Sequence, residues 1–111
     1  MKTYLAASFL ILLASVATAQ KAQKPQDAQF KNIELCNGSS APETRIEACS
    51  AFIEAGRGGR SALATAHNNR GIAYAEKADY GRAVTDFDRA IEIDPTFAKS
   101  LNNRGAARLR A

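Results

Sequence analysis

Apolar residues recur every three or four positions through the second half of the chain, which is the spacing of one helix face. Residues 80–93 show this most clearly, with apolar side chains on one face at Ala83, Val84, Phe87, Ala90 and Ile91. We predict a preceding helix over 61–77, a turn at Asp79 and a stop at Pro95, which lacks an amide donor. A third helix is predicted from residue 96 or 97 to 111.

A weaker helical pattern lies upstream, in residues 30–56. Pro42 suits the first turn of a helix, and apolar side chains then repeat at helical spacing at Ile46, Cys49, Phe52 and Ile53. Gly56 is a natural helix stop, and Ser61 is the predicted N-cap of the next helix. The glycine-rich linker between them lacks the lysine and the strand of a phosphate-binding loop.

The segment 1–19 has the three parts of a secretory signal peptide. Lys2 supplies a positive start, 4–16 is an uncharged apolar run, and Ala17-Thr18-Ala19 is a small-x-small cleavage site. The run is shorter than the roughly 20 apolar residues of a membrane span, so no stable span is expected after cleavage; a retained anchor is the alternative. Residues 20–29 are polar and lysine-rich and are predicted to be a flexible leader.

Residues 64–97 form one unit in which small, aromatic and proline positions define a helix pair. Counting Ala64 as position 1, the small residues stand at 8, 20 and 27, the aromatics at 11 and 24, and proline at 32. These are Gly71, Ala83, Ala90, Tyr74, Phe87 and Pro95. Small residues let two antiparallel helices approach closely, and the aromatics fill the space between them. The unit resembles the tetratricopeptide repeat family, whose period is about 34 residues.

The chain also repeats itself at that period. The string Asn-Asn-Arg-Gly begins at Asn68 and again at Asn102, an offset of 102 − 68 = 34 residues. The resemblance implies an all-α superhelix of antiparallel helix pairs over 30–111. It would comprise a degenerate pair, the full repeat, and a half repeat over 98–111 that serves as a polar cap or belongs to a longer array.

Two positions depart from the family pattern. His67 stands at position 4, where tryptophan is usual, and Arg70 stands at position 7, where an apolar residue is usual. Both departures are expected to weaken packing toward the preceding helix pair. Along the second helix, Arg82 and Asp86 are four residues apart and are expected to form an ion pair.

The two cysteines occupy equivalent places when the degenerate pair is laid over the full repeat. With an offset of 74 − 36 = 38 residues, Cys36 falls on Tyr74 and Cys49 on Phe87, two positions that should touch across a helix pair. The resemblance therefore implies a Cys36–Cys49 disulfide, which an even cysteine count in an exported chain also favours. Two free buried thiols are the alternative.

Composition and motifs argue against catalysis, and we expect no enzyme. The chain has one histidine, no Gly-x-Ser-x-Gly motif and no Cys-x-x-Cys pair, so no catalytic set, metal site or cofactor is predicted. The net charge of +4 is spread along the chain, which argues against nucleic-acid binding.

In the resembled family the first helix of each repeat lines a concave groove. The residues implied to bind a protein or peptide partner there are Asn68, Asn69, Ile72, Lys99, Asn102 and Asn103. Asparagine amides both donate to and accept from a peptide backbone. Asn69, Asn103 and Lys99 resemble residues of family members that clamp peptide carboxylates. Alternatively, the asparagines stabilise the helix pair or meet water.

The sequence therefore predicts an exported bacterial protein of the tetratricopeptide type, periplasmic or secreted. We expect it to bind a peptide or a partner's helix in its concave groove. The alternative is a self-associating structural component of the cell envelope, whose copies stack through their exposed end helices.

Overall fold

The computed structural model describes residues 25–111, and the predicted signal peptide at 1–19 lies outside this range. The described residues contain helices and no strand, which confirms the all-α fold class. The helices are α2 (Pro25–Asn37), α3 (Pro42–Ala55), α4 (Arg60–Glu76), α5 (Tyr80–Ile93) and α6 (Ala98–Arg110). None of these helices is both long enough and apolar enough to cross a membrane.

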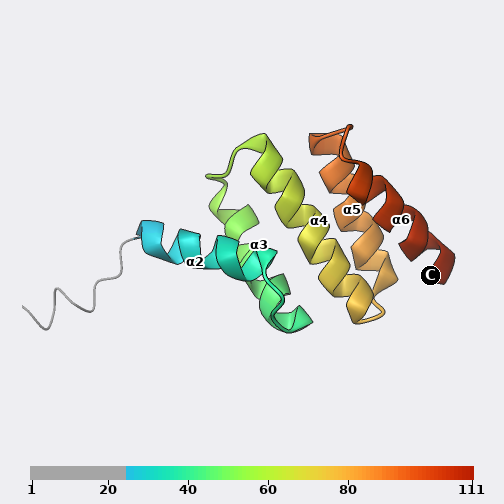
Figure 1. Ribbon diagram of the computed structural model, residues 1–111, viewed down its shortest axis with the longest axis horizontal. Coiled ribbons are helices and arrows are strands. Elements are labelled where there is room, and N and C mark those ends of the chain that lie inside the picture. Colours follow the sequence, from blue (N-terminus) through green and yellow to red (C-terminus); the bar gives the residue numbers. More distant parts are fainter. Residues whose placement is uncertain (1–24) are drawn as a thin grey trace, which may run out of the picture.

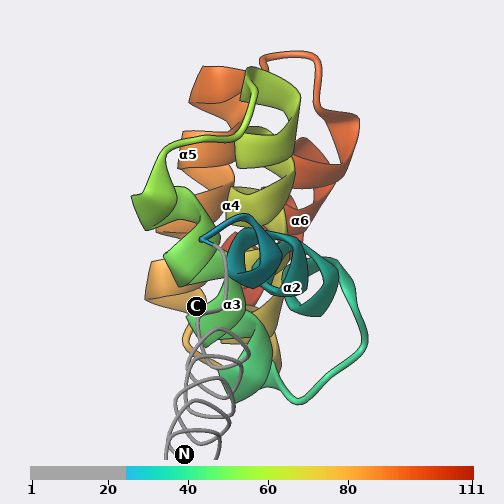
Figure 2. The same cartoon turned by 90° about the vertical axis from the view of Figure 1, so that its left-hand side faces the viewer.

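The helices stack in a row that ends with α6 (Figure 1). α4 and α5 form the most extensive contact, α3 packs on α4, and α6 packs on α5. α4 also touches α2 and α6, so it neighbours all four of the other helices. Seen from the other end of the row, α2 and α3 lie in front of the layer formed by α4, α5 and α6 (Figure 2).

The first described helix starts earlier than the sequence predicted. α2 begins at Pro25, so residues 25–29 are helical and the prediction of a flexible leader is wrong for them. Proline suits the first position of a helix, because an amide hydrogen there would lack a helical partner in any case. Asp27 lies in the first turn, where its negative charge faces the positive end of the helix dipole. Residues 20–24 lie outside the described range.

The junction between α3 and α4 agrees with the sequence at one end and differs at the other. Gly56 ends α3 with a left-handed φ of 62°, and its amide donates to the Ile53 carbonyl oxygen at 3.1 Å. The predicted stop is thus confirmed. α4 has Gly59 as its N-cap and begins at Arg60, so the predicted N-cap at Ser61 is wrong. The extended backbone of Gly59 starts the helix early and leaves Ser61 inside the first turn.

The turn before α5 is fixed by Asp79. Its Oδ1 accepts a hydrogen bond from the Arg82 amide at 3.3 Å, and its Oδ2 lies 3.6 Å from Arg82 Nε. The predicted ion pair between Arg82 and Asp86 is therefore wrong. The Arg82 side chain turns back toward the cap, while Asp86 is buried against α4.

Two apolar clusters hold the row together. The first lies between α2, α3 and α4 and contains Cys36, Ala48, Cys49, Phe52 and Ala66. The second lies between α4, α5 and α6 and contains Ala83, Phe87 and Ala107. A methyl group at Gly71 would lie 2.7 Å from Phe87 Cε1, which is too close for two carbon atoms. The expected close approach of two helices at a small residue is confirmed, because only glycine leaves room for the Phe87 ring.

Cys36 and Cys49 form the predicted disulfide, with their Cα atoms 4.7 Å apart. The described residues contain no free cysteine, so the alternative of two free thiols is not what the structure shows. Both cysteines are buried in the first cluster, where they join α2 to α3. The bond takes the place that aromatic packing holds in the second cluster.

Removing the disulfide is expected to lower stability by more than the small change in packing would. The double variant Cys36→Ser/Cys49→Ser opens a loop of about 14 residues, which costs roughly 3 kcal/mol by the chain-entropy estimate. Urea unfolding of the oxidised protein and of the variant measures the difference. Reductant should move the midpoint of the wild type toward that of the variant and leave the variant unchanged. Equal midpoints for the two oxidised proteins would contradict this expectation.

Candidate functional site

A hollow of about 480 Å³ lies between α4 and α6. It is lined by Thr65, Asn68, Asn69, Ile72, Phe97, Lys99, Asn102 and Asn103. All six residues that the sequence implied for partner binding are among them. Two stretches of the chain that are 34 residues apart meet here, because α4 and α6 are alternate helices of the row and turn equivalent faces to the same side (Figure 1).

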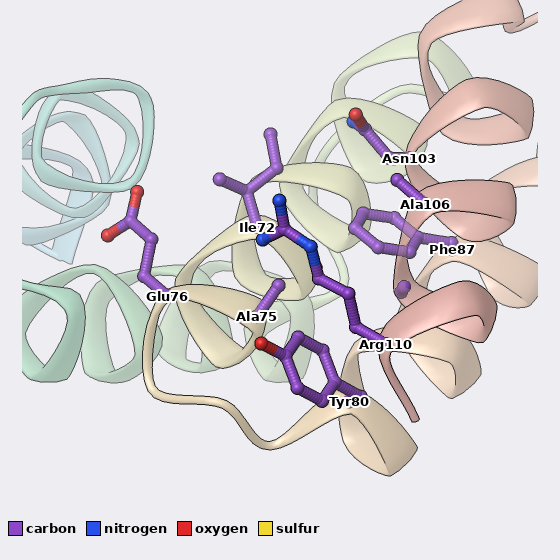
Figure 3. A pocket seen from close by; sticks show the side chains of 9 residues that line it. Ile72, Ala75, Glu76, Tyr80, Phe87, Asn103, Ala106 and Arg110 are labelled. Atoms are coloured by element: carbon purple, nitrogen blue, oxygen red, sulfur yellow. The ribbon is translucent and has the colours of Figure 1, made fainter.

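A second hollow of about 190 Å³ adjoins the first and shares Ile72 and Asn103 with it. Figure 3 shows Arg110 reaching back over this hollow toward Ile72, while Glu76 points away toward α3, where it pairs with Arg45. The apolar lining consists of Ala75, Tyr80, Phe87, Ala106 and Ala107, together with Ile72. We call the two hollows together the α4–α6 groove; it is polar at the Lys99 end and apolar at the Arg110 end.

Asn68 lies in the groove wall but is already engaged within the protein. Its side chain is 3% exposed, and its Oδ1 accepts hydrogen bonds from Ser100 Oγ at 2.8 Å and from Asn103 Nδ2 at 3.0 Å. These contacts tie α4 to α6. Asn68 therefore has the structural role that was the alternative for the asparagines, and Asn103 shares it in part.

The remaining predicted polar residues differ in how free they are. Asn69 Nδ2 donates to Asn37 Oδ1 at 2.8 Å, which links α4 to the end of α2. Lys99 and Asn102 are exposed, and no described residue forms an ion pair or a side-chain hydrogen bond with either. Lys99 and Asn102 are thus the groove side chains best placed to meet a ligand.

The sequence did not indicate the groove residues that lie outside the first helices. Phe97 precedes α6, whereas Tyr80 and Phe87 belong to α5. A repeat pattern that assigns groove positions only to first helices cannot place them, because they reach the groove through the crossing of α5 beneath α4 and α6. Their size and apolar character marked them only as core residues.

Residues 64–97 match the family model for the tetratricopeptide repeat. The chain contains a tetratricopeptide repeat. The matched tetratricopeptide repeat covers most of α4, all of α5 and the following loop, so the resemblance seen in the sequence is confirmed. In general terms the repeat makes the protein a protein–protein interaction module. No curated protein and no solved structure matches the chain.

The two departures of this repeat from the family pattern meet at one buried carboxylate. Asp86 is 3% exposed. Its Oδ2 accepts from Arg70 Nε at 2.9 Å and its Oδ1 from Arg70 Nη2 at 2.8 Å, so the guanidinium binds it with two parallel hydrogen bonds. His67 Nδ1 lies 3.2 Å from the same Oδ1. Because an ionised carboxylate only accepts hydrogen bonds, Nδ1 carries the hydrogen in this pair.

Arg70 also reaches the preceding helix pair. Its Nη1 donates to Ser50 Oγ on α3 at 3.1 Å, so one guanidinium joins α3, α4 and α5. The expectation that Arg70 and His67 weaken packing toward the preceding pair is therefore wrong. Hydrogen bonds replace the apolar contact that the family pattern provides at these positions.

Two opposing effects set the ionisation of Asp86. Burial alone would raise the pKa of the Asp86 carboxyl, but hydrogen bonds from His67 and Arg70 outweigh burial and hold this pKa below its ordinary value of 3.8. The partnership acts in the same sense on the other group, since the hydrogen bond to Asp86 raises the pKa of Arg70. The pair is charged at neutral pH, and stability depends on both charges being present.

The His67–Asp86 pair lines a hollow of about 430 Å³ on another face of the repeat. No hydrogen bond joins His67 to a hydroxyl or thiol anywhere in residues 25–111, so the pair has no nucleophile to activate. In the same part of the chain, no three His, Cys, Asp or Glu side chains gather where they could hold a metal ion.

Proposed function

We propose that the α4–α6 groove binds an extended peptide segment of a partner protein. The observation that carries this proposal is the pairing of unengaged polar groups with an apolar hollow in one continuous groove. The exposed Lys99 and Asn102 offer donors to a peptide backbone or carboxylate. The adjoining hollow over Tyr80 and Phe87 offers a place for an apolar side chain.

The charge of the groove favours an acidic segment. Lys99 and Arg110 stand near its two ends, and neither forms an ion pair with a described residue. The one acid in the groove lining is Glu76, which pairs with Arg45 and points away. A segment with a carboxylate near one end and an apolar side chain near the other matches this distribution.

The proposed setting is the bacterial periplasm or the outside of the cell. The Cys36–Cys49 disulfide supports it, because disulfides persist in oxidising compartments and are rare in reducing ones. The signal-peptide pattern at 1–19 supports it independently.

The groove proposal is tested with a displayed library of short, proline-containing peptides that cannot form helices. Selected peptides are titrated against the protein and against Lys99→Ala/Asn102→Ala. Both replaced side chains are exposed, so the variant should keep its fold. We expect binding to weaken at least roughly tenfold, since two hydrogen bonds are lost and one of them is charged.

The matched control is Lys31→Ala/Gln26→Ala, which removes the same two kinds of exposed side chain from α2. It should bind the selected peptides like the wild type. If no peptide is selected, or if both double variants bind equally well, the groove is not a peptide site.

A second candidate function is a structural one, in which copies of the protein stack through their end helices. The observation that favours it is the presence of exposed apolar side chains at both ends of the row. Phe30 on α2 is 68% exposed, and Leu109 on α6 is 89% exposed. Contacts between such ends would build a linear assembly.

A further inference from the structure

The outer face of α6 repeats the face with which α4 holds α5. An offset of 34 residues relates the two helices (104 − 70 = 34). On α6 this outer face consists of Leu101, Arg104, Gly105 and Arg108, which correspond to His67, Arg70, Gly71 and Tyr74 on α4. α6 lies at the end of the row, with α5 on one side and no helix on the other (Figure 1).

On α4 this face receives a helix through two features. Gly71 leaves room for the Phe87 ring, since a methyl group there would be 2.7 Å from the ring. Arg70 divides its guanidinium between two helices: Nη1 donates to Ser50 on the preceding helix, while Nε and Nη2 bind Asp86 on the following one.

On α6 the same two features are present, and the half that would receive a following helix is open. Arg104 Nη1 donates to Asp88 Oδ1 on the preceding helix at 2.8 Å, as Arg70 Nη1 does to Ser50. No described residue accepts a hydrogen bond from Nε or Nη2 of Arg104. A methyl group at Gly105 would meet nothing within 4 Å.

Charge and apolar exposure define what would fit this face. α6 carries four basic residues and no acidic one, as its sequence AKSLNNRGAARLR shows. Leu101 is 43% exposed and takes the place of His67, so it offers apolar contact where α4 offers a hydrogen bond. An acidic, amphipathic helix complements both properties, whereas a basic helix would be repelled.

We propose that the outer face of α6 docks an amphipathic helix of a partner protein that presents a carboxylate followed directly by a large aromatic residue. The carboxylate binds Nε and Nη2 of Arg104, and the aromatic ring lies over Gly105. This is how Asp86 and Phe87 of α5 bind α4. The surface is distinct from the α4–α6 groove, and the inference does not depend on the groove's function.

The probe is a capped, fluorescent peptide with the sequence of residues 79–94, because that sequence already fits the equivalent face of α4. Its binding to the whole protein is followed by fluorescence anisotropy at low salt. We expect saturable binding that weakens at least tenfold when the peptide carries Phe87→Ala or Asp86→Asn. Binding should also weaken as salt is raised.

The decisive protein variant is Gly105→Leu, which fills the proposed ring site and should abolish binding. Its matched control is Gly81→Leu, because Gly81 is also a helical glycine whose added methyl group would meet nothing within 4 Å. The control should bind the peptide like the wild type. The groove variant Lys99→Ala/Asn102→Ala should also bind it normally, which separates this site from the peptide groove.

Three results would overturn the proposal. The peptide could fail to bind the wild type, or it could bind Gly105→Leu as tightly as the wild type, which would place it elsewhere or exchange it with the protein's own α5. Sedimentation could also show a wild-type dimer that Gly105→Leu separates into monomers. In that case a second copy of the chain, and not a partner helix, covers the face.

Discussion

Replacing Asp86 with alanine is expected to lower the free energy of unfolding by about 3 kcal/mol. The carboxylate is 3% exposed and accepts hydrogen bonds from Arg70 and His67 at the meeting of α4 and α5. Its removal leaves a guanidinium without its partner inside the helix interface, and losing one member of a buried ion pair costs several kcal/mol. The Arg70 side chain is 21% exposed, so water partly compensates, and we expect the lower end of that range.

The matched control for Asp86→Ala is Asp88→Ala, two residues further along α5. The Asp88 side chain is 41% exposed and pairs with Arg104 at 2.8 Å, so its loss should cost less than about 1 kcal/mol. Urea unfolding at neutral pH measures both variants. Equal losses for Asp86→Ala and Asp88→Ala would show that burial of the Asp86 network contributes nothing.

Acid should remove the same stabilisation without a mutation. The pKa of Asp86 in the folded protein lies below the ordinary value of 3.8, so the ionised carboxylate favours the folded state. This contribution is complete well above pH 3.8 and is lost as pH falls through 3.8 toward the lower folded pKa. The stability difference between the wild type and Asp86→Asn should therefore be constant from neutral pH to about pH 5 and shrink below it. A difference that stays constant down to pH 3 would contradict the lowered pKa.

Replacing Phe87 with alanine is expected to cost about 3 to 5 kcal/mol, because it leaves a cavity where a buried ring was. Phe87 is 1% exposed and packs against Gly71 on α4, in the cluster that α4, α5 and α6 share. The site can collapse only a little, since the facing residue is a glycine without a side chain to move inward. The loss is large for a domain whose whole stability is about 5 to 15 kcal/mol.

Thermal and urea unfolding measure this loss, with Phe30→Ala as the matched control. Phe30 is 68% exposed on α2, so the same substitution should change stability by less than about 0.5 kcal/mol. If Phe87→Ala does not fold, Phe87→Leu should still fold and cost about 1 kcal/mol. A Phe87→Ala protein as stable as Phe30→Ala would mean that the second cluster does not hold α4, α5 and α6 together.

The sequence by itself determined the features that depend on local periodicity and repeat spacing. The bounds of α5, the stop at Gly56 and the close packing of Phe87 on Gly71 followed from helical spacing and residue size. The Cys36–Cys49 disulfide followed from laying one helix pair over another. The six groove positions were also found together, because equivalent residues of alternate helices must face the same side.

The tertiary structure decided which of those residues are free and which are engaged. Arg70 and His67 were expected to weaken packing, yet both bind Asp86, a residue 16 and 19 positions away. Asn68 was expected in the groove, yet Ser100 and Asn103, 32 and 35 positions away, engage it. Helical spacing fixes which side of a helix a residue faces. How closely two helices cross sets whether its polar atoms find a partner there, and that crossing depends on all the side chains packed between the helices.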